Sequence, residues 1–423
     1  MARQAEQQQA DTILAGDILF VAGNALYNRM NQPAKQLPFA LAPFAERIDI
    51  VGYVNFYGGP PAPALLRLTC GLRNVAVDRV RVETRGNLRE IVVRKLHLPQ
   101  PLENTLQMFW IDACLRGHLR PDYALTILSG PENCWLAERL LATGRASRLI
   151  YYDTDHFPSY VQRRWSWIAD RQERRLIALA DGVVSVSQPL AALRRRQGAR
   201  QVMVLNNGVP LELFRPAAES LADHPPTLLY TGTLDVRWGV DLALEALPAI
   251  LAHLPSARLV VAGDGPDETA LRCLASQLGI ADSVVFTGRL PYEQLPHLMA
   301  EADFGVATSR PNAFRQYASP MKIADYLAGG LVILCSGGGE GARLVTESGA
   351  GVCIDAQPDQ IARTVLSLWE DRQRMRQMRE KALAYAKTLS WEHGARRLAV
   401  FAAGLVGAGS PSPRFTTLQR QGP

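Results

Sequence analysis

Short apolar runs rich in β-branched residues alternate with longer helix-like stretches along almost the whole chain. This alternation is typical of a parallel sheet that is covered by helices on both faces. The pattern restarts once, after a proline-bearing passage between Val209 and Pro226. We therefore predict an α/β protein built from two doubly wound, Rossmann-like domains, and two such domains imply a cleft.

The strand-like runs recur at regular intervals in both halves of the chain. In the first half we expect strands at residues 17–23, 48–54, 81–84, 91–96, 123–130, 148–153, 182–187 and 201–208. In the second half we expect them at residues 227–232, 257–265, 283–288, 304–308, 331–336 and 350–354. Ligands gather at the carboxyl ends of the strands in open α/β sheets, so the residues after each run are the first candidates for a functional site.

The domain boundaries follow from proline, glycine and polar content. We expect residues 1–16 to be disordered, 17–210 to form an N-terminal domain, 211–226 to be a linker and 227–389 to form a C-terminal domain. A last helix, residues 390–406, follows Ser390, whose hydroxyl is a candidate cap, and we expect it to cross back to the first domain. Residues 407–423, rich in Gly, Ser and Pro, are expected to be disordered.

Length and composition exclude several classes of protein. The chain has 423 residues, 48% of them hydrophobic, and no apolar run approaches the ~20 residues of a membrane span. Its N-terminus lacks a basic-then-apolar signal pattern, which predicts a cytoplasmic protein. The six cysteines show no CxxC or Cys/His ligand spacing, so we expect buried free thiols and neither disulfides nor a metal site. They are Cys70, Cys114, Cys134, Cys273, Cys335 and Cys353.

Arginines crowd one part of the first domain, although the net charge of the chain is only +6. They are Arg163, Arg164, Arg171, Arg174, Arg175, Arg194, Arg195, Arg196 and Arg200. No nucleic-acid recognition motif accompanies them, so a phosphorylated ligand or an anionic membrane surface is favoured and nucleic acid is not expected. The alternative is a solvated helix face that pairs with Asp170 and Glu173.

The segment from Ser309 to Gly330 has the pattern of a strand end, a loop and a helix start in immediate succession. Ser319 is a candidate N-cap and Pro320 fits the first helical position, which predicts an anion site at the helix N-terminus. Lys322 in the first turn offers a cation for a diphosphate, and Asp325 offers a carboxylate for a hydroxyl. An ordinary capped surface helix is the alternative.

Four other strand exits in the second half carry glycine, which lets a ligand approach the backbone closely. They lie in the runs YTGTLDVRWGVD, GDGPDE, FTGRLPYEQ and SGGGE, and two of these runs add an arginine suited to a diphosphate. The candidate contacts with a diphosphate or nucleotide ligand are thus Gly232, Arg237, Gly263, Gly265, Gly288, Arg289, Ser309, Ser319, Pro320, Met321, Lys322 and Asp325.

Polar residues also follow two strands of the first half. Gly23 and Asn24 come after the first strand, where the glycine lets a ligand approach the backbone closely, and a simple strand-to-helix turn is the alternative. No G-x-G-x-x-G follows there, which disfavours a dinucleotide-dependent dehydrogenase. Asp153 and His156 follow the strand at 148–153 and are candidates for a general base, for a sugar contact or for stabilising positive charge. A structural or surface role is the alternative for His156.

In the order and spacing of its motifs, the region of roughly residues 120–400 resembles the retaining glycosyltransferases of family 4, which have the GT-B arrangement of two facing Rossmann-like domains. The motifs are ADGVVSVS, VLNNGVPLELFRP, YTGTLDVRWGVDLALEAL, LVVAGDGPDETALRCLASQLG, VVFTGRLPYEQLPHLMAEADFGVATS and SPMKIADYLAGG, the last with the SP-x-K form of one subgroup. The N-terminal hundred or so residues resemble the family only in pattern, which fits a domain that binds varied acceptors. The resemblance thus implies an acceptor-binding domain at 17–210, with Gly23 and Asn24 as candidate acceptor-side residues, and a domain at 227–389 that binds the nucleotide sugar.

The resemblance implies that Arg237 and Lys322 contact the donor diphosphate, and that Asp325 stands where a helix-borne glutamate meets the nucleotide ribose. A second glutamate of the family, which touches the transferred sugar, falls at Tyr317 here, so the sugar stays open. The usual Lys-Gly after the first strand of this domain is Trp238-Gly239 in this chain.

The resemblance also implies a catalytic set of Asp153, His156, Lys322 and Arg237, because the family's N-domain histidine falls near the first two. The implied reaction moves a sugar with retention from a nucleotide diphosphate sugar to a glycan or lipid-linked acceptor, without a metal or a cofactor. The implied setting is cell-surface polysaccharide biosynthesis at the inner face of the membrane. The alternatives are a sugar-nucleotide epimerase of the same fold, and a non-catalytic relative that binds a glycan or nucleotide.

Overall fold

The computed structural model describes residues 14–23, 33–54, 79–95, 102–159, 166–214, 225–310 and 316–407. The chain forms two compact units, one from residues 1–205 and 394–423 and the other from residues 206–393. The division falls between Leu205 and Asn206, ahead of the expected linker at 211–226. Of the segment 1–16 that we expected to be disordered, Leu14–Gly16 instead begin the first strand.

The first unit contains an eight-stranded sheet in the order β3-β4-β2-β1-β5-β6-β7-β8. Its strands are β1 (Leu14–Gly23), β2 (Ala45–Val54), β3 (Val80–Arg85), β4 (Leu88–Arg94), β5 (Leu125–Ser129), β6 (Leu149–Asp153), β7 (Gly182–Ser185) and β8 (Val202–Val204). All neighbouring strands run parallel except β3 and β4. The order reverses between β1 and β5, which is where open α/β sheets bind ligands.

The pair β3 and β4 departs from the expected all-parallel sheet, because it is an antiparallel hairpin at the sheet edge. The two strands are joined by Gly86 and Asn87 alone, and Gly86 has a φ of +60°. Two residues are enough for a hairpin turn, whereas a parallel connection needs a crossover of a dozen or more.

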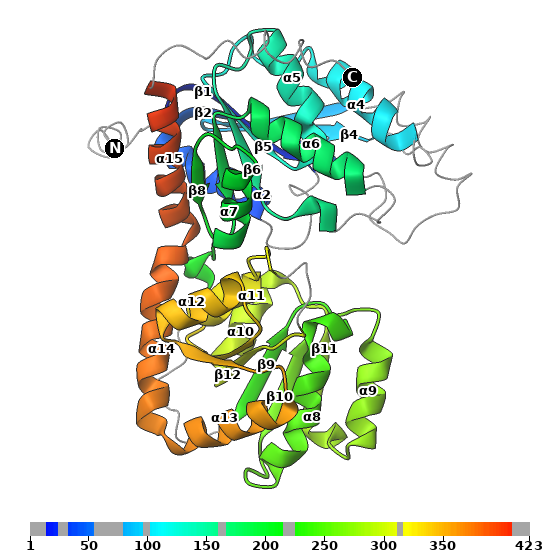
Figure 1. Cartoon of the computed structure of the whole chain (residues 1–423), viewed down its shortest axis with the longest axis vertical. Coiled ribbons are helices and arrows are strands. Elements are labelled where there is room, and N and C mark those ends of the chain that lie inside the picture. Colours follow the sequence, from blue (N-terminus) through cyan, green and yellow to red (C-terminus); the bar gives the residue numbers. More distant parts are fainter. Residues whose placement is uncertain are drawn as a thin grey trace. The chain divides into compact units, whose positions relative to one another are not determined.

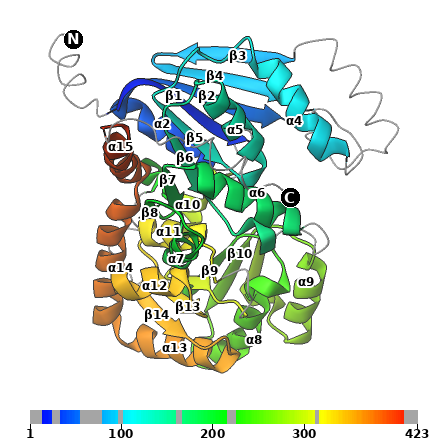
Figure 2. The same ribbon diagram turned by 45° about the horizontal axis from the view of Figure 1, so that its top comes forward.

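Helices cover both faces of this sheet (Figures 1 and 2). They are α2 (Pro33–Leu41), α4 (Leu102–Leu115), α5 (Cys134–Ala142), α6 (Ser166–Leu179), α7 (Gln188–Arg196) and the end of α15 (Trp391–Gly407). One apolar cluster joins α4, α5 and α6 to one face of the sheet and includes Val183 of β7. The neighbouring Gly182 faces the other way, since a Cβ there would lie 2.8 Å from the Phe401 ring of α15.

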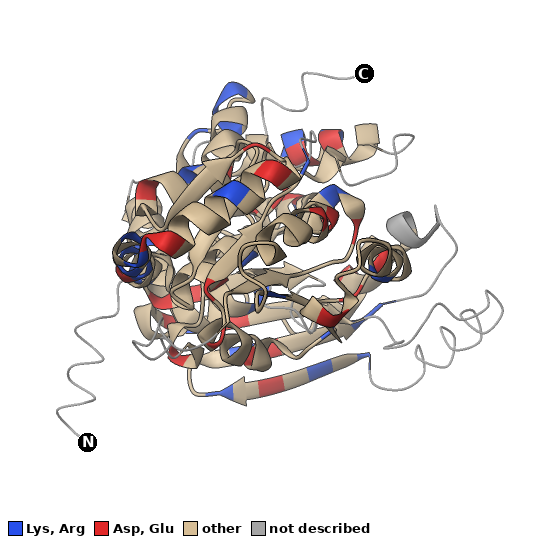
Figure 3. Ribbon diagram, turned by 90° about the horizontal axis from the view of Figure 1, so that it is seen from below, with Lys and Arg blue, Asp and Glu red and all other residues tan. Residues whose placement is uncertain are grey.

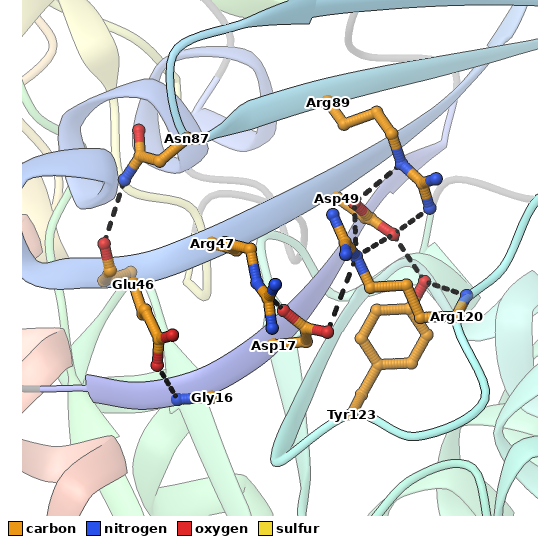
Figure 4. A network of polar contacts seen from close by, with 10 residues as sticks. Gly16, Asp17, Glu46, Arg47, Asp49, Asn87, Arg89, Arg120 and Tyr123 are labelled. Carbon is orange, nitrogen blue, oxygen red and sulfur yellow. Dashed lines mark hydrogen bonds and ion pairs between the residues drawn. The ribbon is translucent and has the colours of Figure 1, made fainter.

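A buried polar network ties the first unit together towards the amino ends of its strands (Figure 4). Asp49 of β2 is 1% exposed and pairs with Arg89 of β4 and with Arg120. It also accepts a hydrogen bond of 2.6 Å from the Tyr123 hydroxyl. A buried carboxylate needs such partners, and here they link three neighbouring segments away from the carboxyl edge of the sheet.

The second unit contains a six-stranded, all-parallel sheet in the order β11-β10-β9-β12-β13-β14. Its strands are β9 (Thr227–Thr231), β10 (Arg258–Ala262), β11 (Val284–Gly288), β12 (Phe304–Ala307), β13 (Val332–Ser336) and β14 (Gly351–Ile354). The chain runs outward from β9 to β11 and then returns to pair β12 with β9. The strand order of this sheet therefore reverses between the neighbouring strands β9 and β12, which is its switch point.

The two faces of this second sheet carry separate apolar clusters. The helices of the unit are α8 (Val240–Leu251), α9 (Glu268–Gln277), α10 (Leu295–Ala300), α11 (Met321–Ala328), α12 (Glu340–Ser348), α13 (Pro358–Glu370) and α14 (Arg372–Ala386). One cluster contains Leu228 with residues of α8, α9 and α13, and the other contains Leu229 with residues of α11, α12 and α14. Successive side chains of a buried strand thus serve opposite faces, as a doubly wound sheet requires.

Charge is spread over the molecule, with Lys and Arg positions interspersed among Asp and Glu along the described ribbon (Figure 3). Among the described residues, none of the helices combines the length and the apolar character that a bilayer crossing requires. The free cysteines divide between buried and accessible positions: Cys134 and Cys335 are buried and Cys114 is partly exposed. Cys273 and Cys353 are exposed, contrary to the expectation of buried thiols.

Candidate functional site

The glycine-bearing exits of three neighbouring strands lie side by side at the carboxyl edge of the second sheet. The Gly232 N–H donates to the carbonyl of Ala262 at 2.9 Å, and the Gly263 N–H donates to the carbonyl of Gly288 at 3.0 Å. A Cβ at Gly263 would lie 1.8 Å from the Gly232 carbonyl oxygen, so only glycine fits. Gly232, Gly263 and Gly288 therefore place backbone atoms without side chains next to one another at the ends of three adjacent strands.

Gly265 has a packing role in the same place. A Cβ at this position would lie 2.2 Å from the carbonyl oxygen of Leu234. The N–H of Leu234 in turn donates to the carbonyl of Asp264 at 2.9 Å. The loops that follow β9 and β10 are thus held backbone to backbone.

The side chain of Lys322 lies across the exit of β9. Its Nζ is 3.9 Å from the ring centroid of Tyr230, and a Cβ at Gly232 would lie 3.3 Å from Nζ. Because Lys322 comes from the first turn of α11, which follows β12, the two sides of the switch point meet at this ammonium group. A cation at a strand exit beside bare backbone suits an anionic ligand.

The start of α11 differs from the sequence expectation. Pro320, and not Ser319, occupies the N-cap position, its backbone is extended, and Met321 is the first helical residue. The Ser319 side chain does not cap the helix. Its carbonyl accepts a hydrogen bond of 2.7 Å from the side chain of Asn207, which is 7% exposed.

Asp325 is buried on α11, with 5% of its surface exposed, and accepts a 2.5 Å hydrogen bond from the Tyr292 hydroxyl. Burial raises the pKa of Asp325 to about 7, while the Tyr292 hydrogen bond and the charge of Lys322 act in the opposite direction. Sequence reasoning did not select Tyr292, although it stands three residues after the exit arginine Arg289. Arg289 itself is exposed and lies 3.9 Å from Asp264.

Arg237, one of the two arginines predicted from sequence to bind a diphosphate, forms an ion pair with a neighbouring residue. The guanidinium of Arg237, in the short helix Val236–Trp238, donates three hydrogen bonds to the carboxylate of Asp235 at 2.6–3.0 Å. A second arginine, Arg310, directly follows the β12 exit and pairs with Asp241 at 2.6 Å. Its place directly after the expected strand at 304–308 was the signal that could have identified it.

Ser309, at the exit of β12, is fastened to the neighbouring strand. Its N–H donates to the Ser336 hydroxyl oxygen at 2.6 Å, and that hydroxyl donates to the Ser309 carbonyl at 2.9 Å. The Ser309 side-chain oxygen is buried and has no hydrogen-bond partner among the described residues. Buried hydroxyls are normally paired, so this one is suited to bond with a ligand.

In the first unit, Asp153 is a structural residue and not an accessible catalytic group. Its carboxylate is fully buried and accepts hydrogen bonds from Arg194 at 2.7 and 2.9 Å and from Ser185 at 3.0 Å. Arg194 also bonds Glu173 at 2.6 Å, so three buried charges form one network. An aspartate with its oxygens committed in this way holds β6, β7 and α7 together.

His156 lies three residues beyond β6 and is partly exposed. Its Nδ1 is 2.6 Å from the hydroxyl of Ser159. Burial and the nearby charge of Arg194 lower its pKa, which favours the neutral imidazole. Of the two predicted candidates at this exit, His156 is the one whose side chain a ligand can reach.

Gly23 ends β1 with a φ of +60° at the switch point of the first sheet. A Cβ there would lie 3.7 Å from Glu132 and 3.8 Å from Asn133, both of which follow β5. Asn133 accepts a 2.8 Å hydrogen bond from the hydroxyl of Tyr53 on β2. The exits of β1, β2 and β5 therefore meet at Gly23, whereas Asn24 lies outside the described residues.

Parts of the chain are similar in sequence to known glycosyltransferases. Residues 214–385 match the family model described as Glycosyl transferases group 1. The GDP-mannose-dependent alpha-(1-6)-phosphatidylinositol monomannoside mannosyltransferase of Mycobacterium tuberculosis is 29% identical over 187 residues, 42% of this chain and 49% of that protein. The GDP-mannose:cellobiosyl-diphosphopolyprenol alpha-mannosyltransferase of Xanthomonas oryzae pv. oryzae is 30% identical over 200 residues, 46% of this chain and 50% of that protein. The matches thus span about half the length of these curated relatives.

Solved structures resemble the whole chain at low identity. Sucrose-phosphate synthase from Thermosynechococcus elongatus has a TM-score of 0.68 at 19% identity, covering 94% of this chain and 100% of that chain. The Anabaena protein HepE in complex with UDP has a TM-score of 0.64 at 17% identity, covering 92% and 100%. The fold is that of the GT-B glycosyltransferases, which confirms the predicted fold class. Residues 214–385 thus resemble the glycosyl transferases of group 1, as the motifs of this region predict.

Proposed function

We propose that this protein is a retaining glycosyltransferase that moves a sugar from a nucleotide diphosphate sugar to a glycan or lipid-linked acceptor. The observation that carries the proposal is the Lys322 ammonium, which lies across the bare backbone of Gly232 at the switch point of the second sheet. The group 1 domain supports it, as do relatives that are named as GDP-mannose-dependent enzymes and a similar structure solved with UDP.

The chemistry demands stabilisation of the leaving diphosphate, because negative charge grows on it as the sugar carbon gains oxocarbenium character. Lys322 supplies a cation, and the Ser309 hydroxyl and the N-terminus of α11 supply hydrogen-bond donors. The acceptor hydroxyl then attacks from the face that the diphosphate leaves, and a departing phosphate oxygen takes its proton. This route retains the configuration without a protein carboxylate as nucleophile.

The decisive variant is Lys322→Ala, assayed for transfer from UDP- and GDP-sugars to extracted lipids and glycans. We expect turnover to fall about tenfold or more, equal to about 1.4 kcal/mol of barrier, because the leaving charge loses its cation. Lys381→Ala, an exposed lysine of the same unit, is the matched control and should keep full activity. Unchanged turnover in a folded Lys322→Ala protein would contradict the proposed site.

The same assay separates the other two functions that fit this fold. A sugar-nucleotide epimerase converts the donor when acceptor is omitted, whereas a transferase converts little donor under those conditions. A non-catalytic relative binds a nucleoside diphosphate and transfers nothing. A thermal-shift panel of nucleoside diphosphates and nucleotide sugars identifies the base and sugar, because a specific ligand stabilises the fold by mass action.

The proposal includes a peripheral contact with an anionic membrane at its cytoplasmic face, where a lipid-linked acceptor would be found. On α6, Trp167 is 61% exposed, and Arg171 and Arg174 follow at i+4 and i+7 on the same helical face, both exposed. An exposed tryptophan beside arginines suits the interface of an anionic bilayer. Of the other crowded arginines, Arg163 and Arg164 lie outside the described residues and Arg194 is buried.

Co-sedimentation with anionic vesicles at low salt tests this clause. We expect the protein to bind the vesicles, and we expect added salt to weaken this binding because it screens the exposed charges. The double variant Trp167→Ala/Arg171→Glu should not bind. Arg258→Glu, an exposed arginine of the second unit, should leave binding unchanged. If the protein does not bind vesicles at low salt, the proposed membrane contact is wrong, but the proposed transferase activity is not affected.

A further inference from the structure

Two cysteines face each other across neighbouring strands of the second unit. The register of β13 and β14 pairs Cys335 with Cys353, each one residue before the end of its strand. Neighbouring strands lie about 4.8 Å apart, and a disulfide joins Cα atoms about 4.4–6.8 Å apart. The two backbone positions are therefore close enough to be bridged.

Both side chains lie on the sheet face that α12 covers. Cys335 is 1% exposed and belongs to the apolar cluster that includes Leu344 of α12. Cys353 is exposed, and its Sγ is 3.6 Å from the Thr346 hydroxyl and 3.6 Å from the Ala342 carbonyl oxygen, both on α12. The pair thus combines one accessible sulfur with one sheltered sulfur.

The accessible sulfur, that of Cys353, also has a lowered pKa. Hydrogen bonds from the Cys335 thiol and the Thr346 hydroxyl lower the pKa of Cys353 to about 6. The thiolate is the form of cysteine that reacts with oxidants and disulfides. A large share of Cys353 is therefore reactive at neutral pH, next to a second thiol.

We propose that Cys335 and Cys353 are a redox-active thiol pair that hydrogen peroxide converts to an intramolecular disulfide. The Cys353 thiolate attacks one peroxide oxygen, an S–O bond forms, the O–O bond breaks, and the hydroxide that leaves takes a proton to become water. The Cys335 sulfur then gives up its proton and attacks the sulfenic sulfur, so that the S–S bond forms and a second water leaves. Two thiols are oxidised by two electrons, and one peroxide is reduced to two waters.

Formation of the disulfide would affect the candidate donor site through Ser336. Ser336 directly follows Cys335, and its hydroxyl makes both hydrogen bonds that hold the Ser309 backbone at the β12 exit. Drawing Cys335 towards β14 pulls Ser336 away from β12 and loosens Ser309. This consequence rests on the proposed function, and it predicts weaker nucleotide binding by the oxidised protein.

Peptide mapping of the native full-length protein tests the thiol pair itself. After treatment with hydrogen peroxide and alkylation of remaining thiols, we expect one linked peptide pair containing Cys335 and Cys353 that dithiothreitol separates. Cys353→Ser should abolish the link, Cys273→Ser, an exposed thiol on α9, should not, and Cys335→Ser should leave a sulfenic acid at Cys353 that dimedone traps. Unlinked Cys335 and Cys353 after complete peroxide treatment, or a link only between molecules, overturns the proposal.

Calorimetry with UDP and GDP on the reduced and oxidised protein tests the coupling to the donor site. We expect oxidation to weaken binding by about threefold or more, and Cys353→Ser to bind equally before and after peroxide. An intact disulfide with unchanged affinity overturns the coupling and leaves the thiol pair. Failure of the reduced protein to bind any nucleotide counts against the proposed function, and the peptide map still decides the disulfide.

Discussion

Among single residues, Asp325 is the group of the candidate donor site whose charge responds to pH in the neutral range. Its burial raises the pKa to about 7, well above the usual aspartate value. The ionised carboxylate accepts hydrogen bonds from ribose hydroxyls, whereas the neutral acid has less capacity to accept them. Nucleotide affinity should therefore rise as pH rises through about 7. The contribution of Asp325 to stability has the opposite sign: it is present at low pH and is lost as pH rises through the folded pKa.

We predict that the affinity for the best nucleoside diphosphate increases between about pH 5.5 and about pH 8.5, with a midpoint near the pKa of Asp325. Asp325→Asn should flatten this profile. Tyr292→Phe removes a donor to the ionised carboxylate and should move the midpoint to higher pH, while Tyr385→Phe, at a tyrosine bonded to Glu347, should not. Calorimetry across this range is the measurement, and a flat profile in the unaltered protein would contradict the assignment.

The buried network around Arg194 leads to a prediction about stability. Arg194→Met leaves Asp153 and Glu173 buried without their cation, which should cost about 3–5 kcal/mol of unfolding free energy. Burial already raises the pKa of Glu173 to about 7, and its ionisation costs stability as pH rises through that value. The deficit of the variant should thus be smaller at about pH 5, where Glu173 is protonated, than at about pH 8, where it must ionise without its cation.

Urea unfolding at the two pH values measures this deficit. Arg195→Met, an exposed neighbour on the same helix, should change stability by less than about 0.5 kcal/mol. If Arg194→Met and Arg195→Met are equally stable, the network does not hold the first unit together. A catalytic role for Asp153 would instead predict Asp153→Asn to reduce turnover without loss of stability.

At the scale of elements, the start of α11 is positioned by the segment that opens the second unit. Asn207 donates to the carbonyl of Ser319, just before the helix that carries Lys322. Its side-chain oxygen is buried without a partner among the described residues, so the amide donor is its essential group. We predict that Asn207→Ala loosens this loop, weakens nucleotide binding about threefold or more and costs about 1–3 kcal/mol of stability.

Nucleotide titrations and urea unfolding on the same samples separate the two effects. The neighbouring Asn206→Ala is the control, since its side chain bonds Glu340 and Arg343 of α12. Equal losses of nucleotide affinity in both variants would mean that the Ser319 bond has no special role in holding Lys322.

The elements themselves were largely predictable from sequence, and their side-chain partners were not. Apolar runs located most strands because these strands are buried on one or both faces, whereas the edge strand β3 has no buried residue. The hairpin at β3 and β4 was missed because a Gly-Asn turn was not weighed against the parallel pattern. The cap of α11 was misassigned by one residue, because the extended backbone continues through Pro320 and the helix begins only at Met321.

The same limit applies to the candidate site. Gly232, Gly263 and Gly288 were found from sequence because a glycine at a strand end is a local signal. Tyr292 and the commitment of Asp153 to Arg194 depend on contacts between distant segments, which no local pattern reveals. Sequence therefore predicts where a site lies in an α/β unit better than it predicts which polar side chains are available there.

At the scale of the whole molecule, each unit has its own switch point, and that of the second unit combines Lys322, the glycine exits of β9 to β11 and the buried Ser309 hydroxyl that has no hydrogen-bond partner among the described residues. A nucleotide that binds there should slow amide exchange most at those exits. We predict that hydrogen exchange with saturating nucleoside diphosphate shows its strongest new protection in peptides containing residues 230–239, 262–266 and 286–292 and the start of α11. Peptides of β1 and β5 should change less, and Lys322→Ala should lose the protection at matched nucleotide concentration. Protection centred on β1 and β5 instead would place the nucleotide in the first unit and reverse the roles proposed for the two sheets.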